Sequence, residues 1–307
     1  MNPSAEFGPV RIYFGHRSGK YPDGNQAIVQ GSDSRAVFDS PLVSHRIGDD
    51  FDQADLVIQG HIHEDHTAGL IRLPRVPVHV HNADRPAIRS WQECEAAFGY
   101  DAKTWKAQKQ YMLEKFSFVL RPDAIGFEDE AVWDLGGGVK VRAIHMPGHT
   151  AGHCVLLVEP VGLAFLGDIE LSGFGPYYGD HTSSLAEMRR TLKRLRSLPA
   201  KIWLTSHHRG IYTDRSSMLR DLEAFEKKIE TRQQKILLLL RDRQRTLEEL
   251  AAHRVLWPEG FDAFWVKATE RNTISQHLEE LIADGMVTVD EQGTYSLKLR
   301  GQSQVPE

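Results

Sequence analysis

Four apolar runs that read as strands each end on imidazole or carboxylate side chains. Loops that follow strands hold polar side chains against a rigid scaffold, and function is often carried there. If these strands lie in one layered protein, their ends meet at one edge of a sheet. The arrangement therefore predicts a single pocket lined by these groups, which are, in chain order, His61-Ile-His63-Glu-Asp65-His66, His149, Asp168 and the pair His207-His208.

The spacing of apolar residues predicts a layered α/β protein up to about residue 215. Short apolar runs separated by turn residues indicate strands, and apolar positions three and four residues apart over 185–195 indicate an amphipathic helix. Because strands and helices alternate, sheets covered by helices are favoured over a helical bundle. We expect helical structure over 84–111, and strands over 27–29, 36–38, 55–59, 76–81, 116–120, 131–133, 139–145, 154–158, 163–166 and 202–205.

The remainder of the chain has a different pattern. A long helical stretch covers 216–240, the capping box Thr246-Leu-Glu-Glu249 opens a second helix, and a third covers 261–282. Residues 286–289 and 294–297 then form a hairpin. This order is typical of a winged-helix domain. We therefore expect a catalytic domain over residues 1–215 and a small winged-helix-like domain over residues 216–307.

Composition argues against several classes of protein. The two cysteines, Cys94 and Cys154, have no paired spacing, so neither a disulfide framework nor a cysteine zinc site is expected. Residues 1–10 lack the features of a signal peptide, and the longest apolar runs are too short to cross a bilayer. We expect a cytoplasmic protein without membrane association. The formal net charge of −5 argues against a nucleic-acid partner, because such partners need a basic excess.

The histidine content indicates metal binding. The chain has fifteen histidines, and metal ligation is the commonest special use of an imidazole. Zinc binds imidazole nitrogen and carboxylate oxygen and is commonly four-coordinate, so the strand-end groups can serve two such ions. A pair of metals can polarise a carbonyl or phosphoryl oxygen and generate a bound hydroxide at neutral pH. We expect two zinc ions, and iron or manganese suits the same ligands.

The order of these motifs resembles that of the metallo-β-lactamase-fold hydrolase superfamily. The resemblance covers roughly residues 10–215, and Asp39 matches an early structural aspartate of that family. It implies a four-layer αββα sandwich with a dinuclear metal site. The motifs that carry it are His61-x-His63-x-Asp65-His66, Pro147-Gly-His149-Thr-x-Gly152, Gly167-Asp168 and a late strand-end histidine.

The resemblance also implies a role for each ligand. His61, His63 and His149 would hold the first metal. Asp65, His66 and the last histidine would hold the second, with Asp168 and a hydroxide bridging the two. Asp65 would also orient the hydroxide or accept its proton, which makes it the expected catalytic residue. For the last ligand, the position two residues after Ser206 favours His208 over His207.

Several further residues are candidates for contact with a substrate. Superfamily members often line the pocket about ten residues after the bridging aspartate, where this chain has Tyr177 and Tyr178. Trp91 could form an apolar wall, and His181 lies in the same loop as the tyrosines. His153 is expected to support the ligands or the core rather than to bind metal.

Three functions are compatible with these features. The tail resembles that of the glyoxalase II-related, β-lactamase-like protein 2 branch, whose members cleave thioesters, esters or single-stranded RNA. We expect hydrolysis of a small-molecule thioester, ester or lactone.

A phosphodiesterase acting on RNA is the alternative, prompted by the tail and by the basic helix face over 189–196, although a solvated surface is the favoured explanation of that face. A DNA-binding regulator is disfavoured because Glu279, Glu280 and Asp284 lie in the would-be recognition helix. A packing role, a homodimer interface or a lid suits the tail better.

Overall fold

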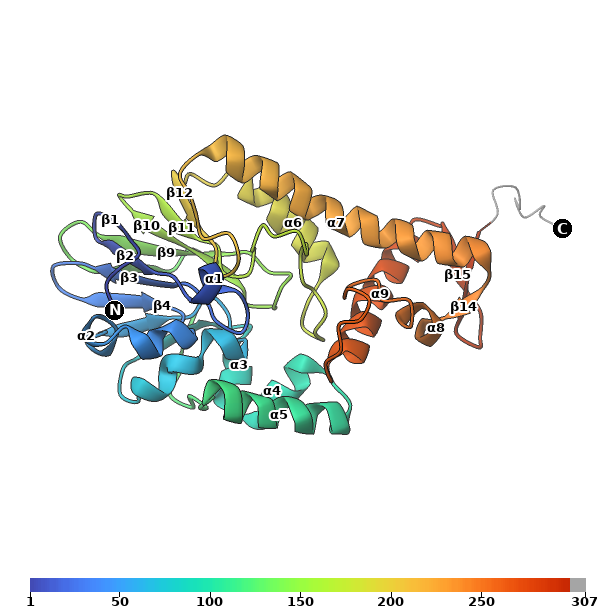
Figure 1. The fold of residues 1–307 in the computed structure, drawn as a ribbon, viewed down its shortest axis with the longest axis horizontal. Helices are drawn as coiled ribbons and strands as arrows, with labels where there is room; N and C mark the ends of the chain where they lie inside the picture. The colour runs from blue at the N-terminus through green and yellow to red at the C-terminus, as the bar shows by residue number, and fades with distance from the viewer. Residues whose placement is uncertain (299–307) are drawn as a thin grey trace.

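Two β-sheets form the centre of the molecule (Figure 1). The computed structural model describes residues 1–298. The larger sheet has the order β1-β2-β3-β4-β5-β6-β7, and the smaller has the order β13-β12-β11-β10-β9-β8. The larger sheet consists of β1 (Ala5–Phe7), β2 (Val10–Tyr13), β3 (Gln26–Gln30), β4 (Arg35–Phe38), β5 (Leu56–Ile58), β6 (Val78–His81) and β7 (Ile125–Phe127). The smaller sheet consists of β8 (Val132–Asp134), β9 (Lys140–His145), β10 (Cys154–Glu159), β11 (Leu163–Phe165), β12 (Ile202–Leu204) and β13 (Ile211–Tyr212).

The two faces of each sheet are both buried. In β3, Ile28 packs with the residues beneath the helices, whereas its neighbour Val29 packs between the sheets. In β10, Leu157 packs beneath the helices on the smaller sheet, whereas Leu156 packs between the sheets. Successive side chains of a strand point to opposite faces. The continuous apolar runs in these strands therefore reflect a sheet covered on both sides.

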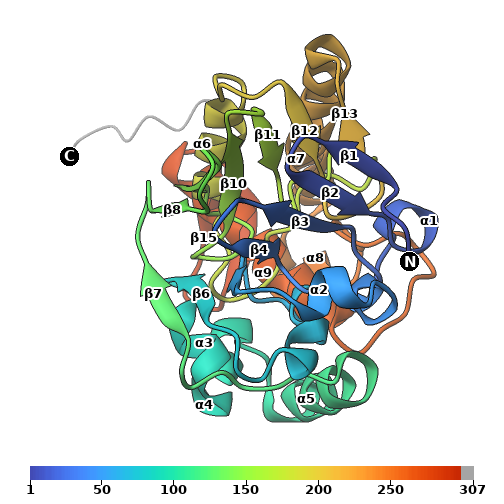
Figure 2. The ribbon, with the colours of Figure 1, turned by 90° about the vertical axis from the view of Figure 1, so that its left-hand side faces the viewer.

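Helices cover the outer faces of the sandwich (Figure 2). One group packs on the larger sheet and the other on the smaller, which gives the expected helix–sheet–sheet–helix order and confirms the predicted α/β fold class. The first group comprises α3 (Arg85–Arg89), α4 (Trp91–Phe98) and α5 (Ala102–Phe116), and the second comprises α6 (Leu185–Leu195) and α7 (Arg215–Asp242). Shorter helical turns are α1 (His16–Gly19), η1 (Leu42–Arg46), α2 (Asp49–Asp52), η2 (Glu64–His66) and η3 (Ala68–Arg72).

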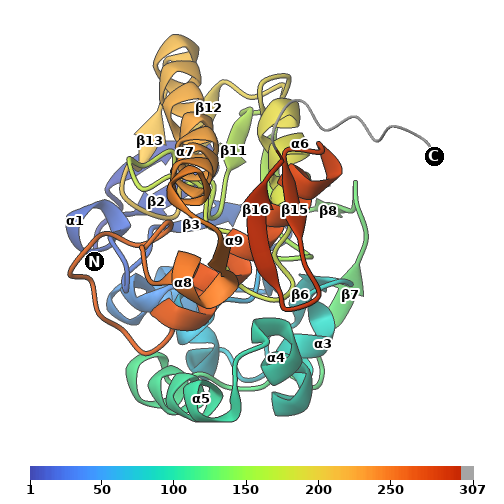
Figure 3. The same cartoon turned by 90° about the vertical axis from the view of Figure 1, so that its right-hand side faces the viewer.

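Helix α7 continues beyond the sandwich and carries the rest of the described chain (Figures 1 and 3). We call residues 243–298 the C-terminal unit. Its own core includes Ile236 and Leu240 from the end of α7, whereas Met218 and Leu222 near the start of the helix belong to the sandwich. The chain therefore passes between the two cores within α7. The unit contains β14 (Arg245–Thr246), α8 (Leu247–Ala251), α9 (Val266–Ala283), β15 (Val287–Val289) and β16 (Thr294–Leu297), with the sheet order β14-β16-β15.

Helix α9 is attached to the catalytic part by several hydrogen bonds. The Tyr178 hydroxyl lies 2.9 Å from Nε2 of His277. Gln276 donates to the carbonyl of Tyr178 at 2.9 Å, and Asn272 donates to the carbonyl of Gly179, also at 2.9 Å. These contacts hold α9 against the loop that follows β11.

Two expected elements differ from the structure. Residues 116–120 do not form a strand: Phe116 ends α5, and Ser117 caps that helix in a left-handed conformation with φ of 51°. The apolar residue Phe118 packs into the helix-covered core instead. The third helix of the tail begins at Val266, not at 261. The capping box at Thr246 and Glu249 and the final hairpin are confirmed. Within residues 1–298, no helix is long and apolar enough to span a membrane.

Candidate metal centre

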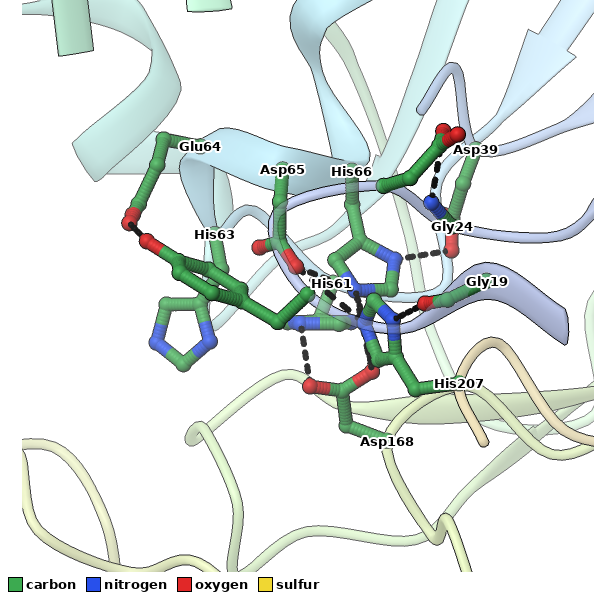
Figure 4. Close-up of polar contacts among 12 residues, drawn as sticks. Gly19, Gly24, Asp39, His61, His63, Glu64, Asp65, His66, Asp168 and His207 are labelled. Carbon is green, nitrogen blue, oxygen red and sulfur yellow. Dashed lines mark hydrogen bonds and ion pairs between the residues drawn. The ribbon is translucent and has the colours of Figure 1, made fainter. Parts of the chain in front are cut away.

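The expected ligands come together where four strands of the two sheets end. His61 and His63 follow β5, and η2 then supplies Asp65 and His66. His149 lies in the loop after β9, Asp168 follows β11, and His207 follows β12. Figure 4 shows Asp168 opposite a group formed by the side chains of His61, Asp65, His66 and His207.

One group of donors consists of His61, His63, His149 and Asp168, whose donor atoms all lie within 4.8 Å of one another. Nδ1 of His63 is 2.8 Å from Nε2 of His149. Oδ2 of Asp168 is 3.2 Å from Nε2 of His149 and 3.8 Å from Nε2 of His61. These are the residues expected to hold the first metal.

The second group consists of Asp65, His66 and His207. Nε2 of His207 lies 3.1 Å from both Oδ2 of Asp65 and Nε2 of His66. The other oxygen of Asp168, Oδ1, is 2.9 Å from Nε2 of His66 and 3.3 Å from Nε2 of His207. Asp168 therefore faces each group with a different oxygen, which is the geometry of a bridging carboxylate.

The donor set fits a pair of metal ions. Both ring nitrogens of His61 are buried and have no hydrogen-bond partner among the described residues, although a neutral imidazole normally uses both. Burial, and then the neighbouring His66, hold the pKa of His61 well below its ordinary value, so the ring is neutral as a metal ligand must be. Tetrahedral zinc with bonds of about 2.0–2.1 Å holds its nitrogen ligands roughly 3.4 Å apart. The shortest nitrogen separations in the two groups, 2.8 and 3.1 Å, approach this value.

Hydrogen bonds outside the two groups orient the ligand rings. Asp39 Oδ2 lies 2.7 Å from His66 Nδ1, as expected for a structural aspartate. The carbonyl of Gly19 lies 2.7 Å from His207 Nδ1, and Asp180 Oδ2 lies 3.0 Å from His63 Nε2. Such partners fix the tautomer and leave the other nitrogen free for metal. Neither Gly19 nor Asp180 was predicted, because neither lies in a recognisable ligand motif.

The acid–base state of the centre follows from these contacts. Burial alone would raise the pKa of Asp168, but the charges of His66 and His207 outweigh it and hold the pKa well below its ordinary value. Burial lowers the pKa of His63, but the hydrogen bond and charge of Asp180 dominate and raise it to about 9. Asp168 is therefore ionised near neutral pH, as a bridging ligand must be.

The last ligand position is occupied by His207, which corrects the prediction of His208. Strand β12 ends at Leu204, and Thr205 then closes a tight turn with Gly210 through paired hydrogen bonds. His207 points inward from this turn. His208 adopts a left-handed conformation with φ of 64°, and its Nε2 lies 3.7 Å from Oε2 of Glu170. Counting residues after Ser206 could not show which side of the turn each imidazole occupies.

His153 has the supporting role expected of it. Its Nδ1 lies 3.0 Å from the carbonyl of Met146, and its Nε2 accepts the backbone N–H of Asp168 at 3.2 Å. Burial, reinforced by the nearby His149, lowers the pKa of His153 to about 3. The ring is therefore neutral, and it holds the backbone of Asp168 in place.

A cavity of about 460 Å³ opens onto the two donor groups. Tyr177 lines this cavity as expected, and its ring centroid lies 6.3 Å from that of His63. The described lining also contains further aromatic residues. They come from the segment between α1 and β3, from α4 and its flank, from the loop after β11 and from the C-terminal unit, and they are Tyr21, Phe98, Tyr100, Phe174, Trp257, Phe261 and Trp265.

Three predicted substrate contacts lie elsewhere. Tyr178 is fully buried and turns away from Tyr177 to reach His277. Trp91 packs against Trp105 and Phe118 in the core beside the larger sheet. His181 is exposed and is not among the described lining residues. Tyr177 and Tyr178 point to opposite sides of their loop, and Trp91 lies in another part of the fold. Of the four predicted substrate contacts, Tyr177 alone lies in the described lining of the cavity.

The basic face over 189–196 is engaged in ion pairs. Arg189 pairs with Glu230 and Glu280, which ties α6 to α7 and α9. Arg194 lies 3.7 Å from Asp129, and Arg196 pairs with an acidic residue of α7. The arginines of this face are therefore paired with neighbouring carboxylates, which reduces the charge available to a phosphate-bearing partner.

Solved structures with the same fold extend over both parts of the chain. A metallo-beta-lactamase family protein from Thermus thermophilus superposes with a TM-score of 0.71 at 23% sequence identity, covering 95% of this chain and 99% of that chain. A beta-lactamase domain protein from Burkholderia ambifaria gives a TM-score of 0.67 at 16% identity, covering 96% and 94%. An archaeal metallo-beta-lactamase superfamily protein from Sulfolobus tokodaii gives a TM-score of 0.54 at 16% identity, covering 88% of this chain and 98% of that chain.

Two sequence comparisons were informative in different ways. A search of curated proteins gives no match, whereas a family profile matches more than half of the chain. The profile described as the metallo-beta-lactamase superfamily matches residues 31–207, which include every donor of both groups. Members of this superfamily are generally metal-dependent hydrolases. The chain belongs to the metallo-beta-lactamase superfamily.

Proposed function

We propose that the chain is a dinuclear-metal hydrolase that cleaves a thioester, ester or lactone of a small molecule. The observation that carries this proposal is Asp168, whose two oxygens face two separate groups of imidazole and carboxylate donors. A bound metal pair polarises the carbonyl oxygen of a substrate and lowers the pKa of water, so that hydroxide is available at neutral pH. Zinc suits these donors best, and iron or manganese could take the same positions.

Asp65 is the proposed catalytic residue. It lines the cavity, and its Oδ2 lies 3.1 Å from His207 Nε2. Burial would raise the pKa of Asp65, but the charges of His66 and His207 and the hydrogen bond from His207 outweigh it and lower the pKa. The carboxylate is therefore ionised and can orient the attacking oxygen by accepting its hydrogen bond.

The described lining favours a small uncharged substrate over a nucleic acid. Lys20 is the one lysine or arginine in it, whereas Glu64, Glu170 and Asp180 add three acidic groups beyond the metal ligands; burial raises the pKa of Glu64 and of Glu170 to about 7. A phosphate backbone needs the opposite balance. We further propose that the C-terminal unit is a winged-helix variant with a packing role, because its helix α9 is occupied by contacts with the loop of Tyr178. The cytoplasmic location stays a prediction.

The test is hydrolysis of a panel of acyl thioesters, esters and lactones by zinc-loaded protein, with a single-stranded RNA oligonucleotide as a further substrate. We expect turnover of at least one acyl substrate, and its loss in His63→Ala together with loss of bound metal. Turnover of the panel no faster than with His63→Ala would overturn the proposal. Cleavage of RNA alone would identify the phosphodiesterase instead.

A further inference from the structure

Resting on the proposed function, we propose that the C-terminal unit forms a binding wall for an uncharged aryl or long acyl group of the substrate. Trp257 is the specificity-determining residue of this wall. The indole lies 6.2 Å from the ring of Tyr177 and 5.1 Å from the ring of Phe174, measured between centroids. Tyr177 in turn lies beside the donor histidine His63. A row of aromatic rings thus leads from the metal centre to the C-terminal unit.

The outer end of this row remains accessible. Phe261 stacks on Trp257 with centroids 4.8 Å apart and an angle of 16° between the rings. Phe261 is 39% exposed, and both rings line the cavity. Apolar surface exposed beside a catalytic centre is a common mark of a ligand site. A flat aryl group or an extended acyl chain has the shape to cover these ring faces while its carbonyl carbon reaches the metals.

Trp257 is held in place by a buried carboxylate. Glu270 on α9 is 1% exposed, and its oxygens accept the backbone N–H groups of Val255, Leu256 and Trp257 at 2.7–3.0 Å. The indole N–H of Trp257 donates to Oγ1 of Thr269 at 2.7 Å. The segment before α9 has no helix or strand of its own to fix it. Glu270 is therefore a positioning residue, since it sets the segment from which Trp257 projects.

The cavity offers little positive charge to an anionic group at this wall. Lys20 is the one lysine or arginine in the described lining, and it is far outnumbered there by aromatic rings and carboxyl groups. Removal of the indole face should weaken binding of an aryl group by roughly tenfold, because aromatic contacts in a pocket are worth about that much. A short acyl group such as acetyl does not extend to the wall, so its binding should weaken much less when the indole is removed.

The experiment compares phenylacetyl and acetyl thioesters of N-acetylcysteamine, a neutral thiol. For Trp257→Ala we expect the ratio of the two kcat/KM values to fall about tenfold through a higher KM for the aryl substrate. Trp257→Phe should restore part of the ratio. Phe264→Ala removes an exposed aromatic residue of the same segment that is absent from the described lining, and it should leave the ratio unchanged.

Glu270 is tested by two variants. Glu270→Ala should lower the same ratio, and Glu270→Gln, which keeps one acceptor oxygen, should recover part of it. Circular dichroism and metal content confirm that each variant folds and is loaded. An unchanged ratio in folded, metal-loaded Trp257→Ala would overturn the proposal.

A binding measurement with a ligand that cannot be hydrolysed tests the aromatic wall independently of the proposed hydrolase activity. Benzylacetone, a neutral aryl ketone that cannot be hydrolysed, should bind the metal-loaded wild type about tenfold more tightly than Trp257→Ala in calorimetry. That result would support the wall even if no thioester is cleaved. Equal affinity for the two proteins would contradict the wall even if thioesters are cleaved.

Discussion

The orientation of His63 depends on a residue outside every recognised motif. Asp180 accepts from the hydroxyls of Tyr100 and Tyr177 at 2.9 and 3.0 Å, and its other oxygen meets Nε2 of His63. The carboxylate is thereby held on one side of the imidazole. Nδ1 is left facing His149 and the centre.

We predict that Asp180→Ala lowers metal affinity by a factor of about 10 to 100, the usual effect of losing such a partner. Without the carboxylate, the His63 ring can rotate or take the tautomer that protonates Nδ1. Competition with a chromogenic chelator measures the affinity. His181→Ala is the control, because the side chain of this neighbour is exposed and is not among the described lining residues. An equal loss in both variants would contradict the role of Asp180.

The pair His207 and His208 allows a matched comparison of adjacent residues. His207→Ala should remove one metal per chain, because this ring contacts both Asp65 and Asp168. His208→Ala should retain both metals, because its ring lies toward Glu170 at the cavity edge. Elemental analysis of the two purified variants measures the difference. Loss of metal from His208→Ala with retention in His207→Ala would reverse the assignment.

The ligand residue types and their order were predictable because short spacings after strands keep donors together. The choice between adjacent histidines was not predictable, because it depends on the direction of the turn that starts at Thr205. The same reason separates Tyr177 from Tyr178. The local sequence shows which side chains are present, but the backbone conformation of the turn determines which of two adjacent side chains points into the centre.

At the scale of elements, α9 holds the C-terminal unit against the loop of Tyr178 in the catalytic part. His277 is fully buried at this contact and bonded to the Tyr178 hydroxyl. Burial, and then the charges of Arg232 and Arg189, lower the pKa of His277 to about 3. The ring is therefore neutral in the folded protein throughout the physiological range.

This contact predicts a loss of stability in acid. Below the ordinary pKa of 6.5, the unfolded chain binds a proton at His277 that the folded chain does not bind until about pH 3. The contribution to stability is thus complete above pH 6.5 and falls as the pH decreases, by about 2 kcal/mol at pH 5. His277→Gln should lose correspondingly less stability between pH 7 and pH 5 in urea unfolding. Equal losses for the two proteins would contradict this.

Element types were predictable where a local rule decided them. The capping box at Thr246 and the hairpin near residue 290 follow from local hydrogen bonding and turn residues. The expected strand over 116–120 was wrong because apolar residues at a helix end and in the turn beyond it also alternate with polar ones. Residues 261–265 were predicted to belong to the helix that begins at Val266. Phe261 and Trp265 of this segment line a cavity, and the local sequence does not distinguish such residues from those of a helix core.

At the scale of the whole molecule, the metal centre connects the two sheets. Its donors come from the end of β5 in the larger sheet and from the ends of β9, β11 and β12 in the smaller. Bound metal therefore links segments that otherwise meet only through the core between the sheets. Ligands that bind only the folded state stabilise it by mass action.

We predict that removal of the metal lowers the melting temperature. Metal present at about a thousand times its dissociation constant adds roughly 4 kcal/mol, which corresponds to a shift of about 5–10 °C for a chain of this size. Differential scanning calorimetry before and after chelation measures the shift, and added zinc should reverse it. A melting temperature unaffected by chelation would show that the donors do not bind metal in the folded protein.

The layered fold was predictable because strands and helices alternate along the chain, and continuous apolar strands indicate burial on both faces of a sheet. The contact between the cavity and the C-terminal unit was not, because Tyr177 and Trp257 lie far apart in the chain and no spacing rule connects them.

The central claim is that one carboxylate joins two metal positions. Anomalous X-ray diffraction from crystals of the zinc-loaded protein tests it most directly. We predict two zinc peaks per chain, one among His61, His63 and His149 and the other among Asp65, His66 and His207, with Asp168 between them. A single peak, or a second peak beside His208 instead of His207, would contradict the account.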